Sequence, residues 1–419
     1  MTMTNECCKI DVPPIFPDPS RVIDKKSSTT GRLIAGLDIG ASAIRAIVGC
    51  VTDNGIEIVG VGSTALLGGR PWFAYDVEKS GASIRMAVEE AERMAGCTVT
   101  SAYVGISGGH IKGFNSQGIT TIDNLTVSVV DLKRVMADAI AITIPTDREV
   151  IHAIPRSFFI DDQDGIRDPL GMSGSRLKVQ VHVVTGESAF ILHTIESCRR
   201  ANLEVTEIVL KQLASSEAVL SAEEKKRGVV HVDMGGGTTD IAIFSGGAIA
   251  HTAVFDLGGK QLTNDIAATL RIPMKEAEKL KLEDGCCLFS RIAQNETIDL
   301  VSRKWSKNPR FISRWLLVEI IEPWVRKLFH LINREIFKSG YEDHISAGVV
   351  ITGGFGNLEG ILELGEQLFK MPVRRGVPVN ISGPENVMTE PEYATGVGLV
   401  VYGAGKMYGR TKFAEVDQC

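Results

Sequence analysis

The sequence predicts an α/β protein of two similar halves, with a small α+β subdomain inserted into the first half. LIAGLDIGASAIRAIVGCV (33–51) and GVVHVDMGGGTTDIAIFSGG (228–247) share one pattern: apolar strand, Asp, small-residue turn, apolar strand. Such β-branched strands joined by a glycine turn are typical of buried hairpins. The two copies lie about 195 residues apart, which indicates an internal repeat. Helix-like segments follow each hairpin, and this alternation favours sheets covered by helices.

Length and composition limit the class of protein. A chain of 419 residues is too long for one ordinary hydrophobic core, so we expect two or more packed domains. Hydrophobic residues make up 44% and charged residues 23%, as in soluble globular proteins. The net charge of -6 gives no support to a nucleic-acid partner, because phosphate binding needs clustered positive charge. No run of about 18 apolar residues occurs, so no membrane-spanning helix is expected.

The N-terminus and the cysteines favour a cytoplasmic protein. Residues 1–31 are expected to form a mostly disordered extension, because the segment holds four prolines and lacks the apolar stretch of a signal peptide. None of the eight cysteines forms a C-x-x-C motif, and the eight histidines form no H-x-x-x-H motif. This pattern favours reduced thiols over disulfides or a cysteine–histidine metal site.

Helical periodicity places the covering helices. The first helix is expected over 77–96, where apolar residues recur every three or four positions from Ile84 to Met94 and Gly96 stops the helix. The segment 312–340 predicts a long amphipathic helix, bent or restarted near Pro323. Four further helices are expected at 187–203, 211–226, 259–270 and 274–282.

The segment between the first helix and residue 187 departs from the strand–helix alternation of the rest of the chain. SAYVGISGGHIKGF and LKVQVHVVTG are typical of strands, and VDLKRVMADAIAIT is typical of a helix. DDQDGIRDPLGMSGSR is polar and glycine-rich, so a loop is expected there. We therefore expect an inserted small α+β subdomain over about 101–186.

The two Asp-Gly hairpins carry the strongest chemical signal. Asp38 precedes Gly40 and Ser42, and Asp233 precedes the run Gly235–Thr239. Glycine in such a turn lets backbone N–H groups approach a phosphate closely, and a hydroxyl adds a donor. The Asp at the strand end can hold Mg²⁺ directly or through water. One glycine-rich turn alone is more often a plain hairpin, but two at matching places would clamp a polyphosphate between two domains.

Two later segments fit the same ligand less specifically. ITGGFGNLEG (351–360) predicts a strand, a Gly-Gly turn and a helix start, and such a turn lets backbone pack against adenine or ribose. The alternative is that this segment is an ordinary strand–helix turn that binds no ligand. LGGKQLTNDIA (257–267) opens a helix with free N–H groups for a phosphate or a polar cap. Glu278 and Lys281 lie three apart on the next helix, where they would reach ribose and base or form a solvated ion pair.

Taken in this order, these segments resemble the actin/Hsp70/sugar-kinase superfamily and, within it, the FtsA family of bacterial cell-division proteins. The match covers roughly 32–404. The superfamily needs only the two phosphate loops and the adenosine loop, whereas the FtsA assignment depends on GISGGHIKGF and GIRDPLGMSG, which resemble that family's small subdomain. Other matching segments are VHVVTG, QLASSEAVL, TNDIA, AEKLK and YATGVGL. The resemblance implies an actin-like two-lobed ATPase fold, that is, duplicated ribonuclease-H-like domains with the inserted small α+β subdomain.

The resemblance also divides the chain after the extension at 1–31. The first lobe would comprise a core at 32–100, the insertion at 101–186, helices at 187–227 and a returning segment at 382–404. The second lobe would comprise a core at 228–258, a helical subdomain at 259–345 and the adenosine loop region at 346–381, and a short tail would follow at 405–419.

ATP and Mg²⁺ are the ligands that the resemblance implies. Mg²⁺ would be held through water by Asp38 and Asp233, and no catalytic residue is identified. The implied ATP-binding residues are Asp38, Gly40, Ser42, Asp233, Gly235, Gly236, Gly237, Thr238, Thr239, Gly259, Thr263, Glu278, Lys281, Gly353 and Gly354.

The resemblance implies a scaffold that binds the acidic C-terminal tail of FtsZ, self-assembles into filaments, organises the Z ring and recruits other division proteins. It would work at the inner face of the cell membrane at the septum. In the segment 308–327, Arg310, Arg314, Arg326 and Lys327 would supply positive charge beside an apolar groove wall. The alternative is a solvated basic helix face.

Three departures from the family pattern bear on function. Ala41 and Ala43 replace a hydroxyl and a cation in the first loop, and Lys211 stands where many superfamily members place an acid that orients the attacking water. We therefore expect ATP binding with weak or no hydrolysis. The final segment, YGAGKMYGRTKFAEVDQC, shows no lipid-facing apolar stripe, so we expect either that the protein reaches the membrane through partners or that its tail has been lost or truncated.

Other readings of the same fold stay open. A PilM-like pilus-assembly scaffold would share the ATP lobes and an inserted subdomain. A small-molecule kinase would need a substrate pocket with a catalytic carboxylate, and no motif identifies one. An Hsp70-type chaperone would carry a long substrate-binding region after its ATPase domain.

Overall fold

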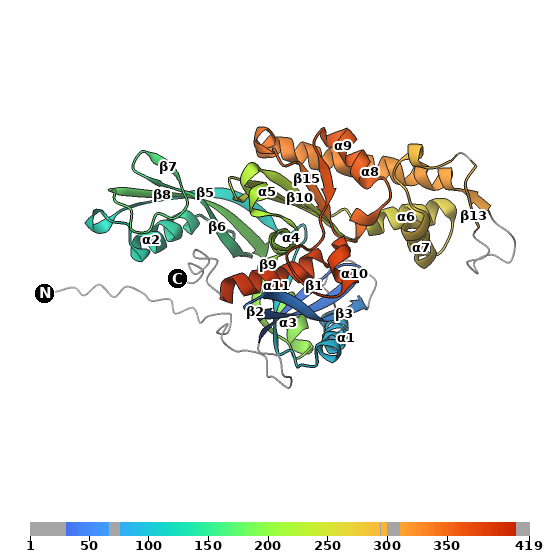
Figure 1. The fold of residues 1–419 in the computed structure, drawn as a ribbon, viewed down its shortest axis with the longest axis horizontal. Helices are drawn as coiled ribbons and strands as arrows, with labels where there is room; N and C mark the ends of the chain where they lie inside the picture. Colours follow the sequence, from blue (N-terminus) through green and yellow to red (C-terminus); the bar gives the residue numbers. More distant parts are fainter. Residues whose placement is uncertain (1–30, 67–75, 294, 300–310, 408–419) are drawn as a thin grey trace.

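The computed structural model describes residues 31–66, 76–293, 295–299 and 311–407 (Figure 1). The expected disordered extension up to residue 30, the predicted binding residue Arg310, and the tail after residue 407 lie outside these ranges.

Two five-stranded sheets with the same strand order form the two halves. The first sheet has the order β3-β2-β1-β4-β9, and the second has the order β12-β11-β10-β15-β16. In each, an antiparallel meander of three strands is extended by two strands parallel to its first strand. The predicted duplicated α/β architecture is therefore confirmed. The strands of the first sheet are β1 (Arg32–Ile39), β2 (Ala43–Thr52), β3 (Gly55–Ala65), β4 (Ser101–Ile106) and β9 (Glu204–Leu210). Those of the second are β10 (Val229–Met234), β11 (Thr239–Ser245), β12 (Ala248–Phe255), β15 (Val349–Thr352) and β16 (Val373–Arg375).

The inserted subdomain projects from one end of the molecule, at the left of Figure 1. Its sheet has the order β5-β8-β6-β7, formed by β5 (Lys112–Thr121), β6 (Arg148–Ile160), β7 (Gln163–Ile166) and β8 (Arg176–Glu187), with α2 (Val129–Ile140) packed against it. Two details differ from the sequence analysis. Residues 101–106, placed in the insertion, pair with β1 and β9 of the first-lobe sheet. The expected loop after residue 160 contains β7, because Asp161 adopts left-handed backbone and turns the chain back onto β6.

The predicted helices are present, with two differences in continuity. The expected helix at 211–226 is two helices, because Leu220 is extended and Ser221 starts α5 with a capping box to Glu224. The long helix continues through Pro323 instead of restarting there. The helices are α1 (Val77–Ala95), α3 (Ser188–Arg200), α4 (Lys211–Val219), α5 (Ala222–Arg227), α6 (Gly259–Leu270), α7 (Met274–Asp284), α8 (Arg314–Ser339), α9 (Ile361–Phe369), α10 (Glu385–Thr389) and α11 (Ala394–Met407).

Short elements complete the chain. A two-stranded ribbon of β13 (Thr297–Asp299) and β14 (Phe311–Ser313) precedes α8. Single 3₁₀ turns are η2 (Asp123–Leu125), η3 (Phe289–Arg291), η4 (Glu342–His344), η5 (Gly354–Asn357) and η6 (Pro391–Tyr393). Among the helices of the described ranges, none has the length and apolar character needed to span a bilayer.

One hydrophobic cluster joins the two halves. It contains Ile47 and Val209 of the first sheet, Val350 of the second, and buried residues of α4 and α11. The helices α4 and α11 pack at very short range, because a methyl group on Gly398 would lie 1.9 Å from the Ala214 carbonyl oxygen. The position of one sheet relative to the other therefore depends on this helix pair.

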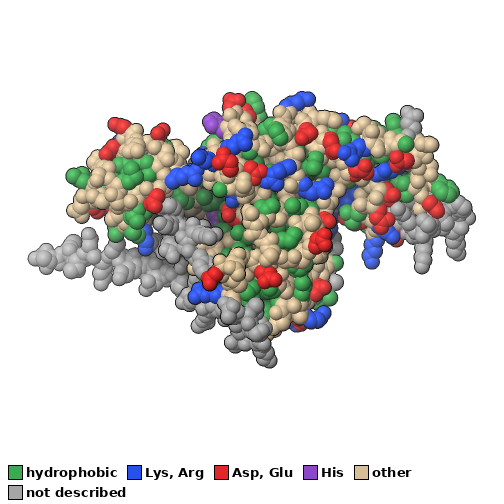
Figure 2. Space-filling view, viewed as in Figure 1, with side chains coloured by type: hydrophobic (Ala, Val, Ile, Leu, Met, Phe, Trp, Pro, Cys, Tyr) green, Lys and Arg blue, Asp and Glu red, His purple; other side chains and the backbone are tan. Residues whose placement is uncertain are grey.

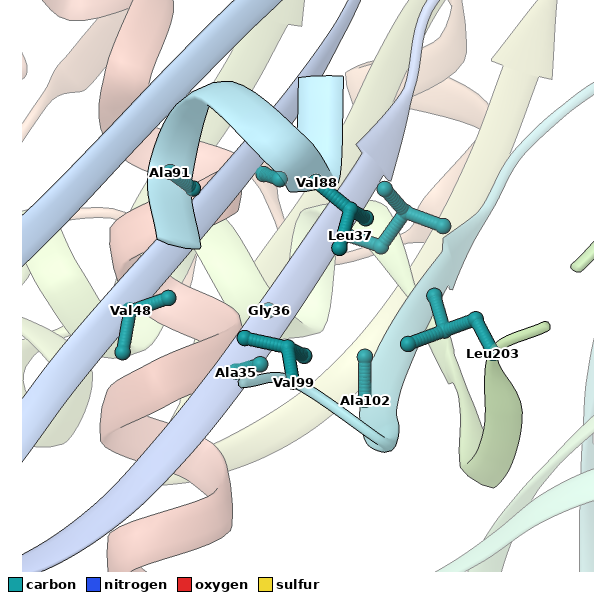
Figure 3. Close-up of a pocket in the computed structure, with 10 residues that line it drawn as sticks. Ala35, Gly36, Leu37, Val48, Val88, Ala91, Val99, Ala102 and Leu203 are labelled. Atoms are coloured by element: carbon teal, nitrogen blue, oxygen red, sulfur yellow. The ribbon is translucent and has the colours of Figure 1, made fainter. Parts of the chain in front are cut away.

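The first lobe also contains a small apolar cavity of about 10 Å³, between its sheet and α1 (Figure 3). That volume is about the minimum for one water, and the apolar lining gives water no hydrogen-bond partner. We therefore assign the cavity to imperfect core packing rather than to a ligand. Its lining includes Ala35, Leu37, Val48, Val88, Ala102 and Leu203.

Gly398→Ala is expected to destabilise the protein by about 3 kcal/mol, because α11 would have to move away from α4 to make room for the methyl group. Gly405→Ala in the same helix is the matched control, since its methyl group would meet no atom within 4 Å. The control should unfold at or slightly above the wild-type temperature. Differential scanning calorimetry of the three proteins checks this, and equal midpoints for the two variants would contradict the close contact.

Candidate functional site

The predicted phosphate loops lie where parallel strands of both sheets end. The strands β1, β4 and β9 run parallel in the first sheet, so their carboxyl ends meet at one edge. The strands β10, β15 and β16 do the same in the second sheet. Open α/β sheets bind ligands outside the carboxyl ends of their strands. Asp38 lies at the end of β1, and Asp233 lies at the end of β10.

The two hairpin turns face each other. Each is closed by a backbone bond: the Gly40 amide donates to the Ala43 carbonyl at 3.0 Å, and the Gly235 amide donates to the Thr238 carbonyl at 2.9 Å. A methyl group built on Gly236 would lie 2.0 Å from Ser42 Oγ. The structure therefore brings together the two loops that the sequence separates by nearly half its length. Their backbone N–H groups and hydroxyls form a donor-rich surface suited to phosphate.

Three carboxyl groups are buried beside these turns: Asp38, Asp233 and Asp240. Asp233 Oδ2 accepts a hydrogen bond from Thr395 at 2.8 Å, and Asp240 accepts from Ser107 and Thr238. Burial raises the pKa of Asp233 to about 6, and the nearby Asp38 carboxylate adds to the rise. Burial raises the pKa of Asp240 to about 7, with Asp233 as the second cause.

Lys211 supplies a positive charge to this cluster. Its Nζ lies 2.7 Å from Asp38 Oδ1 and donates to the Ile39 carbonyl at 2.7 Å. Its charge also opposes the rise of the pKa at Asp233 and Asp240. Lys211 therefore holds the end of β1 instead of standing free as a base.

Asp38 does not fit as a magnesium ligand while Lys211 holds it. A cation on Asp38 would lie close to the ammonium that contacts the same carboxylate. Two like unit charges 4 Å apart near a protein surface repel by about 4 kcal/mol, and a divalent ion would double that. Within the described ranges, no three His, Cys, Asp or Glu side chains are grouped as a metal site.

A second polar cluster joins α6 to α7. Lys281 Nζ donates to Glu278 Oε2 at 2.8 Å, to Thr263 Oγ1 at 2.9 Å and to the Gly259 carbonyl at 3.1 Å. Thr263 also donates to Glu278. Lys281 is only 5% exposed, and this burial lowers its pKa while Glu278 opposes the shift. The predicted Glu278–Lys281 pair therefore forms, as a brace between α6 and α7 in which Lys281 is buried and Glu278 is partly exposed.

The Gly-Gly turn after β15 completes the arrangement. Gly353 has a φ of 82°, and a methyl group there would lie 2.4 Å from Asp233 Oδ1, so this position requires glycine. Gly354 is open, because its methyl group would meet only Glu392, at 3.5 Å from Oε2. The third predicted loop thus lies directly beside the second phosphate loop.

Sequence reasoning missed several residues of this site. Asp240 lies on β11 two positions after Thr238, the last residue of the turn, so the GGGTTD motif contained a signal for it. The Ser107–Asp240 hydrogen bond gave no such signal, because the two residues lie 133 positions apart in the sequence. The same holds for the 2.7 Å ion pair between Arg45 and Glu392, which lie 347 positions apart.

The basic residues predicted around α8 have different environments. Arg314 bonds Glu296 at 2.9 Å, Glu359 at 2.6 Å and the Asp284 carbonyl at 3.0 Å, so it ties three segments together. Arg326 pairs with Glu322 one turn earlier in the helix. Lys327 is exposed. The structure therefore does not form one continuous basic face from these residues.

Comparison with solved structures shows the fold. The PilM–PilN type IV pilus biogenesis complex matches with a TM-score of 0.64 at 17% identity, covering 88% of this chain and 98% of that chain. MreB5 of Spiroplasma citri bound to ADP matches with a TM-score of 0.51 at 14% identity, covering 92% of this chain and 99% of that chain. The predicted actin-like two-lobed fold is confirmed.

Comparison with curated sequences shows the family. The family described as cell division protein FtsA matches residues 230–398, and the SHS2 domain inserted in FtsA matches residues 108–185. Cell division protein FtsA of Escherichia coli is 36% identical over 384 residues, covering 90% of this chain and 91% of its own length. That of Pseudomonas aeruginosa is 47% identical over 382 residues, covering 91% of each chain. The chain therefore belongs to the FtsA family of cell division proteins.

Proposed function

We propose that this chain is an ATP-binding scaffold of cell division that binds the C-terminal tail of FtsZ, self-assembles, and thereby organises the Z ring and recruits further division proteins. The observation that carries the proposal is the contact of the two hairpin turns, at Ser42 and Gly236. This contact brings two sets of backbone N–H donors to one place, as a polyphosphate requires.

The phosphates would lie against the turns that follow Asp38 and Asp233. The adenosine would lie at Gly353 and Gly354, near the Glu278–Lys281 brace. Lys281 stands 5.9 Å from the centre of the Phe355 ring, so an aromatic face and a fixed ammonium lie at this end of the site. Solved structures of Spiroplasma citri MreB5, which share the fold, are bound to ADP and to AMPPNP.

Binding with little hydrolysis is the expected chemistry. Lys211 stands at the end of β9, where an acid would be needed to orient an attacking water, and its ammonium is held by Asp38 and Ile39. Mg²⁺ bound with ATP would neutralise phosphate charge. Asp233, with one oxygen bonded to Thr395, is the carboxylate that would hold its water shell.

The tail of FtsZ would dock on the exposed side of α8. Leu316 and Lys327 are both exposed and lie eleven residues apart. Eleven residues make three helical turns, which places both side chains on one face about 16 Å apart. An acidic-apolar peptide would find an apolar contact at Leu316 and a cation at Lys327. Arg314 is excluded from this role, because its guanidinium is used by internal bonds.

Self-assembly would use the tip of the inserted subdomain. Leu125, Val129, Val130 and Leu170 are each more than half exposed there. Backbone bonds from Gly171 to Val127 and from Gly174 to Leu125 place the two segments side by side. Figure 2 shows hydrophobic side chains on this subdomain, at the left of the view. Contiguous exposed apolar surface of this kind is typical of protein–protein contact. Filaments formed in this way would gather at the inner face of the membrane at the septum, through partners.

Gly354→Val is expected to weaken ATP binding at least about tenfold, because its Cβ would meet no protein atom closer than 3.5 Å while the side chain fills the proposed adenosine position. Titration with a fluorescent ATP analogue measures the effect. Gly405→Val, which adds the same side chain where no atom lies within 4 Å, is the control. Unchanged affinity in the Gly354 variant would place the nucleotide elsewhere.

Lys327→Glu is expected to weaken binding of a peptide matching the host's FtsZ tail about tenfold, because an acidic peptide would meet a reversed charge. Fluorescence anisotropy at two salt concentrations measures the loss, which should shrink at high salt. Lys338→Glu is the matched control, three turns further along α8 and 60% exposed. An equal loss in both variants would show a general charge effect instead of a docking site.

Val130→Glu is expected to reduce the protein that sediments in the presence of ATP, because it places a charge in the apolar patch. The substitution is compatible with folding, since an acidic residue in the first turn of α2 is favourable. Leu192→Glu on α3, where the side chain is 60% exposed, is the control. Sedimentation of the Val130 variant at the wild-type level would remove this patch from the assembly contact.

A further inference from the structure

The position of Lys211 is set by the end of β9. It is the first residue of α4, so its backbone lies at the same strand-end edge as Asp38. Its stem crosses β4, since a methyl group on Gly105 would lie 3.3 Å from Lys211 Cγ. The side chain is only 13% exposed. The ammonium is therefore held at the edge of the site and is not a mobile surface charge.

The contacts of this ammonium leave room for an anion. An ammonium carries three N–H donors. Among the described residues, the Ile39 carbonyl accepts from one of them, and the Asp38 carboxylate lies beside a second at an ion-pair distance of 2.7 Å, although its Oδ1 accepts no hydrogen bond. The third is available beside the turn that follows β1, which contains no basic residue between Asp38 and Ala43. A phosphate seated on that turn would meet the ammonium directly.

A second ammonium supports the same turn from the other lobe. Lys260 Nζ donates to the Ala41 carbonyl at 2.6 Å. Together with Lys211 it fixes two carbonyl oxygens of the first loop, so the loop amides other than that of Gly40, which bonds the Ala43 carbonyl, can face a ligand. Three buried carboxyl groups lie nearby, and a polyphosphate can approach them only if a cation screens the repulsion.

We propose that Lys211 does at Asp38 what a divalent cation would otherwise do: its ammonium bridges the carboxylate to the phosphates of ATP. The proposal rests on the nucleotide site proposed above and adds to it that ATP affinity in this chain depends little on Mg²⁺. The contact on Asp38 carries the argument, because a metal ion and the ammonium would compete for the same carboxylate.

The test compares ATP affinity in excess Mg²⁺ with that in excess EDTA, on the full chain, by competition with a fluorescent ATP analogue. For the wild type, the dissociation constant should rise less than about threefold when Mg²⁺ is removed. When Mg²⁺ is removed, the dissociation constant of the Lys211→Gln variant should rise by a factor at least about ten times larger than that of the wild type. Lys211→Arg keeps the charge and should keep much of the Mg²⁺ independence.

A neutral substitution elsewhere separates this effect from a change in overall charge. Lys279→Gln removes one charge from an exposed site on α7 and should behave as the wild type. A wild-type affinity that collapses in EDTA would overturn the proposal, and so would a Lys211→Gln variant that tolerates EDTA as the wild type does. The Mg²⁺ dependence of ATP affinity in the wild-type protein tests the proposal even where a variant fails to fold. Absence of ATP binding in both conditions would overturn the proposed nucleotide site as well.

Discussion

The close packing of α4 against α11 is the constraint on which the arrangement of this protein depends. A carbonyl oxygen of α4 lies where a methyl group of residue 398 would be, and a methyl group on Gly36 of β1 would lie 2.7 Å from the Gly396 carbonyl. These two helices share one hydrophobic cluster with both sheets. Because the two sheets are fixed through this helix pair, their strand ends face each other and the two hairpin turns come into contact.

That contact concentrates charge in a place with little water. Three aspartates are buried within a few residues of the turns, and an isolated buried carboxylate is strongly unfavourable. The protein offsets this cost with hydroxyl donors, with a raised pKa at Asp233 and Asp240, and with the ammonium of Lys211. The same donors and cation make the site suited to a polyanion. The same charges and donors therefore stabilise the buried aspartates and would bind nucleotide.

Basic residues that look alike in the sequence have different roles in the second lobe. Arg314 bonds two half-exposed glutamates and a backbone carbonyl, and removing it would untie the three segments that it joins. Lys327, thirteen positions further along the same helix, is exposed to solvent. Position on the helix, more than charge, decides which of these residues can contact another protein.

The sequence by itself determined the hairpins, the three glycine-rich loops, most of the helices and the presence of the inserted subdomain. Each of these is specified by contiguous residues: β-branched strands, turn glycines and helical periodicity act locally. Only the tertiary structure decided that Lys211 bonds the end of β1, that Lys281 is buried where it pairs with Glu278, and that Arg45 pairs with Glu392. The reason is distance along the chain, since 172 residues separate Lys211 from Ile39 and 347 separate Arg45 from Glu392. Such pairs are set by how the two sheets pack, and no local pattern encodes that geometry.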